Sequence, residues 1–193
     1  HLETVEISSE QNDFFFRLPV QWVNRPNHEF RGFSGNISSG SVSVGDEIIA
    51  LPSLRTSIVK SIIGTKGKKN SAETGEAITL CLVDEIDISR GDVIANVNDR
   101  PEVTDQFQAH IIWMHDDDML PGRPYLFKTT NKTIEGVITE LKYKVNVNSL
   151  EHESSKILKL NEVGLVNINL GEPIGFDAFN NNKLIGMVQP EKK

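Results

Sequence analysis

The sequence is poor in cysteine, and this scarcity excludes two ways of stabilising a fold. Cys81 is the only cysteine among 193 residues, so the chain can form neither an internal disulfide bond nor a cysteine-rich zinc site. It lies within the apolar run EAITLCLV, which predicts a buried small hydrophobe rather than a nucleophile. The near absence of cysteine also favours a reducing compartment, and we expect a cytoplasmic protein.

Long apolar runs are missing as well. No stretch of about 18 apolar residues occurs, so the sequence predicts no membrane-spanning helix and no membrane partner. The N-terminal stretch HLETVEISSE has neither the basic nor the apolar segment of a signal peptide. It also lacks an initiator methionine, from which we expect the chain to be a fragment of a longer protein.

The chain has no excess of positive charge. It contains 20 Lys and Arg against 27 Asp and Glu, for a net charge of -7. Proteins that bind nucleic acids through phosphate contacts are usually basic, so we expect no nucleic-acid partner. The local exception is TKGKK, at positions 65–69.

Catalytic and phosphate-binding motifs are also absent. GTKGKKN resembles a P-loop only in composition, because Gly64 and Gly67 are three residues apart rather than five, and a solvated loop is the simpler interpretation. WMHDDDM joins His115 to three aspartates, which are metal-ligand types, but neighbouring side chains of an extended chain point apart and favour an acidic loop. We predict no catalytic, cofactor-binding or metal-binding residue.

What the sequence does have is an alternation of apolar and polar residues with a period of two, which predicts β-strands. Glycine and asparagine turns separate these strands. One predicted apolar face comprises Phe16, Leu18, Val20 and Trp22; a second comprises Phe33, Gly35 and Ile37; a third comprises Phe107, Ala109, Ile111 and Trp113; a fourth comprises Val137, Thr139, Leu141, Tyr143, Val145 and Val147.

Helix signals are few. SLEHESSK (149–156) could form a short helix with Ser149 as its N-cap, and DEIDIS (84–89) could form a single turn. A polar, proline-containing boundary at 96–106 separates two strand-rich blocks. We therefore predict an all-β fold of two consecutive small β-barrels, with a lead-in at 1–13, one barrel at 14–101 and another at 102–193.

The stretch NRPNHEFRGFSGNISSGSVSVGDEI (24–48) combines glycines with basic residues. A phosphate-binding loop would need its glycines to lead into a helix N-terminus, and no helix is predicted here. The glycines are better interpreted as turns between strands. Further along, PGRPY (121–125) is predicted to be a turn whose Arg123 either meets a partner's carboxylate or phosphate or is an ordinary surface arginine.

Several stretches resemble a known family. Arg31-Gly32, GSVSVGD (40–46) and RGD (90–92) are similar to the second domain of translation-factor-type GTPases, including elongation factor Tu. More specific stretches resemble the large, GTPase-type subunit of bacterial sulfate adenylyltransferase over almost the whole chain. These stretches are QWVNRPN, DEIDISRGD, IWM, LPGRPYLFK, LKYKVNVNSLEHE and LKLNEVGLVNINL.

The resemblance implies a fold like domains 2 and 3 of elongation factor Tu and a G domain that would precede His1, with residues 1–13 as the tail of that G domain and its linker. GTP and Mg²⁺ would bind in that G domain, with no cofactor in this fragment. The signatures of a G domain are indeed missing: there is no P-loop and no D-x-x-G, and NKTI (131–134) has Ile134 where N-K-x-D has aspartate. One departure is the short NNNKLI after PIGFDAF, where the family usually has a longer stretch.

The function implied is a non-catalytic part of an enzyme that converts ATP and sulfate to adenylyl sulfate and diphosphate, a step of sulfate assimilation driven by GTP hydrolysis. The fragment would bind the small catalytic subunit and its own G domain and transmit the GTPase switch. By analogy, the contact residues would be Arg25, His28, Phe30, Arg31 and Phe33, with Arg123 as a further candidate. Alternatively, Arg31 and Gly32 only shape the start of a strand.

Two other functions stay open at this point. The chain could be part of a tRNA-binding factor that shares these barrels, although its acidic balance opposes this. It could also be a free-standing β-barrel interaction module without a GTPase.

Overall fold

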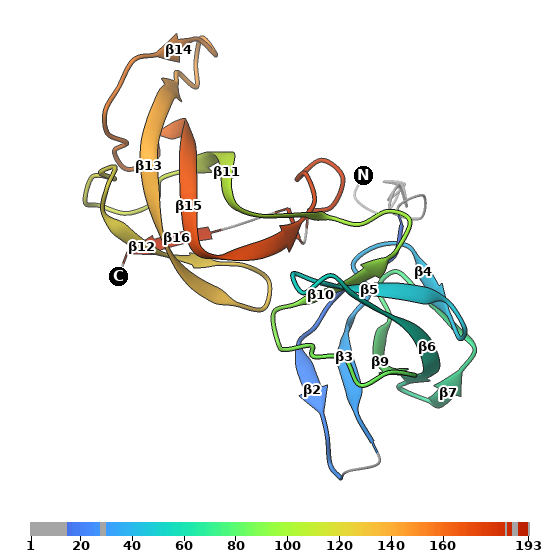
Figure 1. Cartoon of the computed structure of the whole chain (residues 1–193). Coiled ribbons are helices and arrows are strands. Elements are labelled where there is room, and N and C mark those ends of the chain that lie inside the picture. Colours follow the sequence, from blue (N-terminus) through green and yellow to red (C-terminus); the bar gives the residue numbers. More distant parts are fainter. Residues whose placement is uncertain (1–14, 28–29, 184, 187–188, 193) are drawn as a thin grey trace, which may run out of the picture. The chain divides into compact units, whose positions relative to one another are not determined.

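The computed structural model describes residues 15–27, 30–183, 185–186 and 189–192, and within these ranges the chain folds into strands and turns without a helix (Figure 1). The all-β prediction is therefore confirmed. The predicted lead-in at 1–13 lies outside the described residues. Contacts divide the chain into two compact units, the first with residues 1–102 and 175–187, and the second with residues 103–174 and 188–193. The domain limits predicted from the sequence stay a prediction.

The first unit is built on one long sheet. Its strand order is β1-β10-β5-β6-β9-β3-β2, β7 pairs with β6, and β4 and β8 form a separate pair. The strands are β1 (Arg17–Pro19), β2 (Trp22–Asn24), β3 (Gly32–Asn36), β4 (Ser41–Ser43), β5 (Glu47–Leu51), β6 (Arg55–Gly64), β7 (Gly67–Lys69), β8 (Ser71–Glu73), β9 (Ala77–Leu82) and β10 (Val93–Asn96).

The long sheet closes on itself. The Arg17 amide donates to the Ser39 carbonyl at 3.0 Å, and the Ser38 amide donates to the Arg17 carbonyl at 2.9 Å. These bonds join β1 to the chain just after β3, so the sheet encloses an apolar core. That core comprises Phe16, Leu18, Val20, Phe33, Ile37, Val42, Ile48, Ala50, Val59, Ile62, Ala72, Ile78, Leu80, Leu82, Ile88 and Ile94.

The predicted inner face of β3 is confirmed, since Phe33, Gly35 and Ile37 are all buried. Gly35 is required by a close approach between strands: a Cβ at this position would lie only 2.3 Å from the carbonyl oxygen of Pro19. The buried, free Cys81 also agrees with its predicted role as a small hydrophobe.

The prediction for Trp22 was wrong. Phe16, Leu18 and Val20 are buried as expected, but Trp22 is 63% exposed. The chain changes its pairing partner between these residues, because β1 pairs with β10 whereas β2 pairs with β3. The alternation is interrupted at this change, so the face predicted from an unbroken strand does not continue to Trp22.

The second unit contains a sheet in the order β11-β15-β13-β12-β16, with β14 added to β13. Its strands are β11 (Glu102–Ile112), β12 (Pro124–Lys128), β13 (Thr133–Val145), β14 (His152–Glu153), β15 (Val163–Phe176) and β16 (Gln189–Lys192). The third predicted face is confirmed, because Phe107 and Ala109 are half-buried and Ile111 and Trp113 are buried. β11 and β15 each begin in one unit and end in the other.

The predicted face of β13 was only partly right. Ile134 and Ile138 are buried in the first half of the strand, Thr139 is exposed, and Leu141 is buried in the second half. The register against β15 shifts just after Ile138. Thr139 is thus the extra residue of a β-bulge, which moves the buried positions from even to odd numbers. Val147, also expected on this face, lies beyond the strand and is 62% exposed.

The possible helix at 149–156 does not form. The side-chain oxygen of Asn146 accepts hydrogen bonds from the amides of Asn148, at 3.0 Å, and Ser149, at 3.3 Å, which builds a turn instead. Leu150 then takes a left-handed conformation with φ of 59°, and the chain continues into β14. Residues 84–89 form no helical turn either.

A charged network fixes the end of β13. The Lys144 ammonium donates to Glu162 at 2.9 Å and lies 3.4 Å from Glu153. The bond to Glu162 raises the pKa of Lys144. The pKa of Glu162 is lowered, first by a backbone hydrogen bond from Lys159 and then by Lys144. The pKa of Glu153 is lowered mainly by a hydrogen bond from the Asn146 side chain.

Residues 175–187, which we call the return segment, start with the last two residues of β15 and belong to the first unit. Arg17, only 4% exposed, holds this segment. Its Nε donates to Asp177 at 2.9 Å, and its Nη2 donates to Asp99 at 3.0 Å and to Asp177 at 3.3 Å. Nη1 donates to the carbonyls of Asp99 and Phe16. All five donors of the guanidinium are therefore satisfied.

A second buried contact holds the return segment. The Asn182 side-chain amide donates to the hydroxyls of Ser38 and Ser39, both at 3.2 Å. These serines are the residues through which the sheet closes on β1. The return segment therefore stabilises the closure of the first unit.

Candidate protein-contact surface

The β2–β3 hairpin brings most of the predicted contact residues into one structure. β2 and β3 pair antiparallel, with Trp22 opposite Ser34 and Asn24 opposite Gly32. In Figure 1 this hairpin extends away from the other strands of the first unit. β2 is the last strand in the order of the sheet, so the hairpin lies at an edge. Residues in such a hairpin are well placed to meet a partner.

Arg31 directly precedes β3 and contacts two other side chains, Phe33 and Asp87. Its guanidinium carbon lies 5.5 Å from the centre of the Phe33 ring, within the range of a cation–π interaction. Its only ion pair among the described residues is a long one, 3.5 Å to Asp87, whose side chain is 96% exposed. The buried Nε of Arg31 has no hydrogen-bond partner in the described part of the chain. Because the pair with Asp87 is long and exposed, Nη2 of Arg31 keeps the capacity to bind a further acceptor.

Phe33 and Phe30 have different positions. Phe33 is 2% exposed and belongs to the core, so it acts as a support beneath Arg31. Phe30 is half-buried and packs over Gly32, where a Cβ would lie 3.0 Å from the Phe30 ring. The Phe30 amide donates to the Asn27 side chain at 2.9 Å, which fixes the chain beside the hairpin tip.

The remaining predicted residues are spread more widely. Arg25 is exposed near the end of the hairpin. His28 lies outside the described residues. Arg123 belongs to the second unit, where it is exposed in a turn after Gly122, which has φ of 84°. The structure thus brings Phe30, Arg31 and Phe33 together with Arg25 on one hairpin and leaves Arg123 on another unit.

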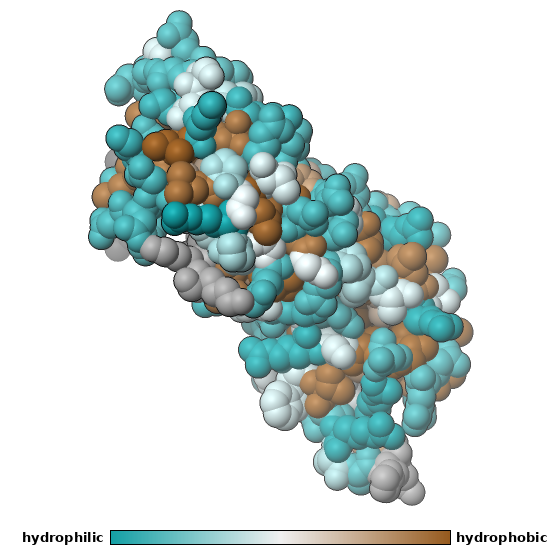
Figure 2. All heavy atoms as spheres, turned by 60° about the vertical axis from the view of Figure 1, so that its left-hand side comes forward, coloured by the Kyte–Doolittle hydropathy of each residue, from teal (hydrophilic) through white to brown (hydrophobic). Residues whose placement is uncertain are grey.

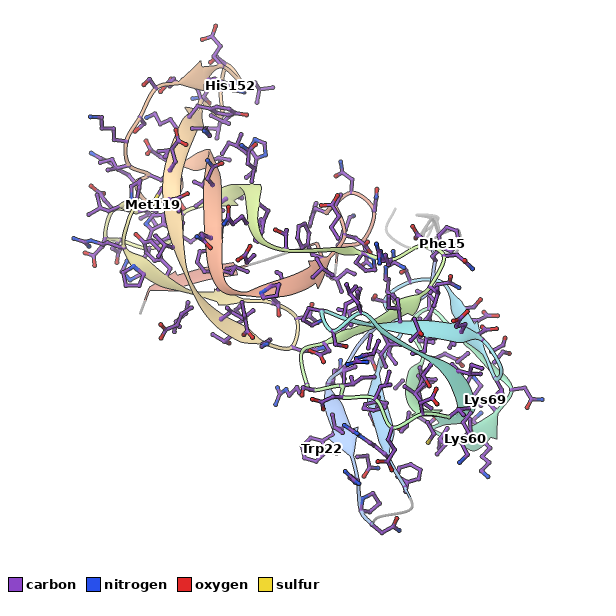
Figure 3. All side chains as sticks on the ribbon, in the orientation of Figure 1. Phe15, Trp22, Lys60, Lys69, Met119 and His152 are labelled. Carbon is purple, nitrogen blue, oxygen red and sulfur yellow. The ribbon has the colours of Figure 1, made fainter. Side chains whose placement is uncertain are left out.

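Sequence reasoning missed Trp22 as a surface residue. Its side chain lies in the same hairpin and is labelled in Figure 3. The signal that could have found it is Pro19, because a proline cannot donate to a sheet and often marks the point where pairing changes. On the face drawn in Figure 2, apolar residues form small separate patches among hydrophilic ones. An exposed Trp in the same hairpin as Arg25 and Arg31 is therefore a more specific contact signal than apolar area.

Two of the four glycines of the 24–48 stretch form turns, as predicted, whereas Gly32 and Gly35 lie within β3. Gly40 and Gly45 have φ of 68° and 95°, and each leads into or out of a short strand. No helix N-terminus faces them among the described residues. The arrangement is that of a β-hairpin series rather than of a phosphate-binding loop.

The acidic loop after β11 makes local hydrogen bonds. The Asp117 amide donates to the His115 ring at 3.0 Å, and the Trp113 indole donates to the Asp117 carbonyl at 2.7 Å. No group of three or more possible metal ligands occurs in the described ranges. No helix of the described residues is long and apolar enough to cross a membrane.

Comparisons with known proteins identify similar sequences. A family model described as GTP-eEF1A C-terminal domain-like matches residues 106–189. Sulfate adenylyltransferase subunit 1 from Teredinibacter turnerae is 44% identical over 96% of this chain and 40% of its own length. The bifunctional enzyme NodQ from Rhizobium tropici is 46% identical over 96% of this chain and 29% of its own length. The chain thus spans well under half of these curated relatives.

Solved structures share the fold at lower sequence identity. Sup35 in complex with GDP matches 95% of this chain and 45% of its own chain, with a TM-score of 0.85 and 15% identity. The elongation factor SelB from Methanococcus maripaludis, in its apo form, matches 91% of this chain and 39% of its own, with a TM-score of 0.70 and 21% identity. These likenesses establish the fold alone.

Proposed function

Because this chain is homologous over nearly its whole length to the corresponding part of sulfate adenylyltransferase subunit 1 and NodQ, we propose that it is the non-catalytic β-region of a GTP-hydrolysing subunit of sulfate adenylyltransferase. The whole enzyme would convert ATP and sulfate to adenylyl sulfate and diphosphate in the cytoplasm. The observation that carries the proposal is the identity of about 45% across 96% of the chain.

GTP and Mg²⁺ would bind in a part of the subunit that this chain does not match. The described residues do not suit that role, since they hold no cluster of metal ligands and their glycine turns lead into strands. Phosphoryl transfer from GTP needs phosphate-binding amides and a coordinated Mg²⁺. We therefore assign these residues a role in binding and in transmitting conformational change, with no chemical step.

The β2–β3 hairpin is the contact surface that we propose for the small catalytic subunit or the G domain. The guanidinium of Arg31 packs on the Phe33 ring. Its ion pair with the exposed Asp87 is weak, because Nη2 and the carboxylate oxygen are 3.5 Å apart. A carboxylate of the partner could replace Asp87 at the Nη2 of Arg31. Arg25, His28 and Phe30 would extend this surface, and Arg123 would offer a second contact from the other unit.

Transmission of the GTPase state requires that the partner bind the GTP-bound and GDP-bound states with different affinity. A closed sheet with a packed core moves as a rigid body, and rotation of rigid bodies about an interface is a common switching movement. The first unit has the properties of such a body, because its sheet is closed at Ser38 and Ser39 and held there by Asn182.

The test is a binding titration of the full chain against the purified small subunit of sulfate adenylyltransferase from the same source. We expect micromolar or tighter binding. Arg31→Gln should weaken it by about tenfold, because a charge-assisted bond at an interface contributes about 1.5 to 3 kcal/mol. Arg55→Gln, an exposed arginine on β6, is the matched control and should leave the affinity within about twofold.

Two results would count against the proposal. Absence of binding up to high micromolar concentration would assign the contact to another part of the subunit or contradict the assignment to this enzyme. Equal losses in the two variants would mean that net charge, rather than the Arg31 site, governs the affinity. Tight binding of tRNA instead would indicate a tRNA-binding factor.

A further inference from the structure

A second surface of the first unit differs from its surroundings in charge. The stretch from Arg55 to Ala72 contains five basic residues and no acidic residue. The rest of the chain then has 15 basic and 27 acidic residues. Four of the five basic residues are lysines of the β6–β7 hairpin, namely Lys60, Lys66, Lys68 and Lys69. A compact basic region on an acidic protein creates a local positive potential, which attracts negatively charged groups.

The strand geometry directs three of these lysines outward. Val59 and Ile62 of β6 are buried, and the register shift between Val59 and Ser61 makes Lys60 the extra residue of a bulge. Lys68 pairs opposite Ile63, the outward neighbour of Ile62. Lys66 lies in the turn between the strands. Lys60, Lys66 and Lys68 are all exposed, and none of them forms an ion pair with a residue that the structure describes.

The fourth lysine has a different role. Lys69 donates to both carboxylate oxygens of Glu76, at 2.5 and 2.6 Å, and this bond lowers the pKa of Glu76. Lys69 is therefore neutralised within the unit. Figure 3 shows Lys60 and Lys69 on the same side of the first unit. The pair of Lys69 and Glu76 leaves the positive charge of the three outward lysines available to a partner.

A cavity lies beside these lysines. Its volume is about 380 Å³, and its lining includes Lys66, Lys68, Gly64 and Gly67. Gly67 has φ of 112°, and no described atom lies within 4 Å of the place where its Cβ would be. The backbone of Gly67 is therefore accessible between the ammonium groups of Lys66 and Lys68. A hollow of this size can receive one or two carboxylate side chains.

We propose that the β6–β7 hairpin, with Lys60, Lys66 and Lys68, is a docking site for an acidic segment of a protein partner. Carboxylates would pair with the three lysines, one of them entering the cavity beside Gly67. This surface is separate from the β2–β3 hairpin and goes beyond the function proposed above.

Two observations favour an acidic protein over a nucleic acid. The cavity lining has no aromatic side chain on which a base could stack. The remaining surface carries a large excess of acidic residues, which would repel a long polyanion beyond the hairpin. A short acidic segment would stay within about one Debye length of the lysines and avoid this repulsion.

The experiment is a fluorescence anisotropy titration of the full chain with a labelled oligo-glutamate peptide at low ionic strength. We expect Lys60→Gln, Lys66→Gln and Lys68→Gln together to weaken binding by about tenfold, since three exposed ion pairs at about 0.5 kcal/mol each amount to one decade. The matched control combines Lys128→Gln, Lys156→Gln and Lys183→Gln, exposed lysines elsewhere with the same change of charge. It should change the affinity by less than about twofold.

Replacement of the same three lysines by arginine should restore binding, because the charge is kept. The proposal is overturned if the wild-type chain does not bind the peptide, or if the control set weakens binding as much as the hairpin set. It is also overturned if single-stranded RNA displaces the peptide with higher affinity than the peptide itself. None of these results bears on the titration with the small subunit, so the two proposals can fail separately.

Discussion

At the scale of residues, four of the turns share one hydrogen-bonding pattern. In each, the first and fourth residues share a backbone hydrogen bond, and the side chain of the acidic fourth residue accepts from the amide of the first. The third residue has a positive φ, between 64° and 99°. The four turns are Ser43–Asp46, Glu73–Glu76, Ser89–Asp92 and Lys159–Glu162.

The turn at 159–162 differs from the other three because Asn161, rather than glycine, takes the positive φ, here 64°. Asn161→Gly should leave the melting temperature nearly unchanged, because glycine adopts this conformation freely. Asn161→Ala should cost about 1 kcal/mol, since a Cβ without a local hydrogen-bonding group is strained there. Thermal unfolding followed by circular dichroism measures both, and equal melting temperatures for the two variants would contradict the explanation.

These four turns also show which parts of the structure could be predicted from the sequence. The S-x-G-D pattern at 43–46 and 89–92 is visible in the sequence, and a turn was predicted at the first of these places. The equivalent turn at 159–162 was not predicted, because its third residue is Asn161 and its fourth is Glu162. Trp22 was misplaced for a similar reason, since the change of pairing partner after Pro19 depends on distant β10 and β3.

At the scale of elements, the alternation of apolar and polar residues predicted where strands occur better than it predicted which residues of each strand are buried. The inner face of β3 was predicted correctly because the strand is short and regular. The face of β13 was wrong in its first half, because the bulge at Thr139 is set by the register against β15. The possible helix after Ser149 failed because Leu150, its first residue, takes a left-handed conformation and the chain turns back to pair β14 with β13.

The return segment gives the element-scale prediction. Arg17→Gln should lower the free energy of unfolding by about 3 kcal/mol, because it leaves the carboxylates of Asp99 and Asp177 without their shared partner in a partly buried site. Urea denaturation measures this loss. Hydrogen exchange should also become faster in residues 175–183, which would separate a local release from general destabilisation.

The control for this change is Arg55→Gln on the exposed side of β6, which should alter stability by less than about 0.5 kcal/mol. If hydrogen exchange in residues 175–183 stayed as slow as in the wild type, Asn182 and its two serines would be sufficient to hold the segment.

At the scale of the whole molecule, the hydrogen-bonded glutamates predict how stability depends on pH. The pKa values of Glu76, Glu153 and Glu162 are lowered in the folded state from the ordinary 4.5, so their contribution is present above about pH 4.5 and is lost as the pH falls below it. The pKa of Lys144 is raised from 10.5, so its contribution is present below that pH and is lost above it.

We therefore expect a plateau of stability between about pH 5 and pH 10, with declines on both sides. Urea midpoints measured across this range provide the test. Glu162→Gln should make the acid decline shallower and should also reduce the alkaline decline, because Glu162 is the main cause of the raised pKa of Lys144. A profile unchanged by this substitution would mean that the network at β13 does not contribute to stability.

The return segment has a further consequence, for the order in which the protein is made. The first unit emerges from the ribosome with Arg17, Ser38 and Ser39 in place, but Asp177 and Asn182 follow about 75 residues after its last earlier residue. At typical elongation rates of about 5 to 20 residues per second, this is a delay of several seconds. During that interval the guanidinium of Arg17 lacks two of its carboxylate contacts, and the seam where the sheet closes lacks the hydrogen bonds from Asn182.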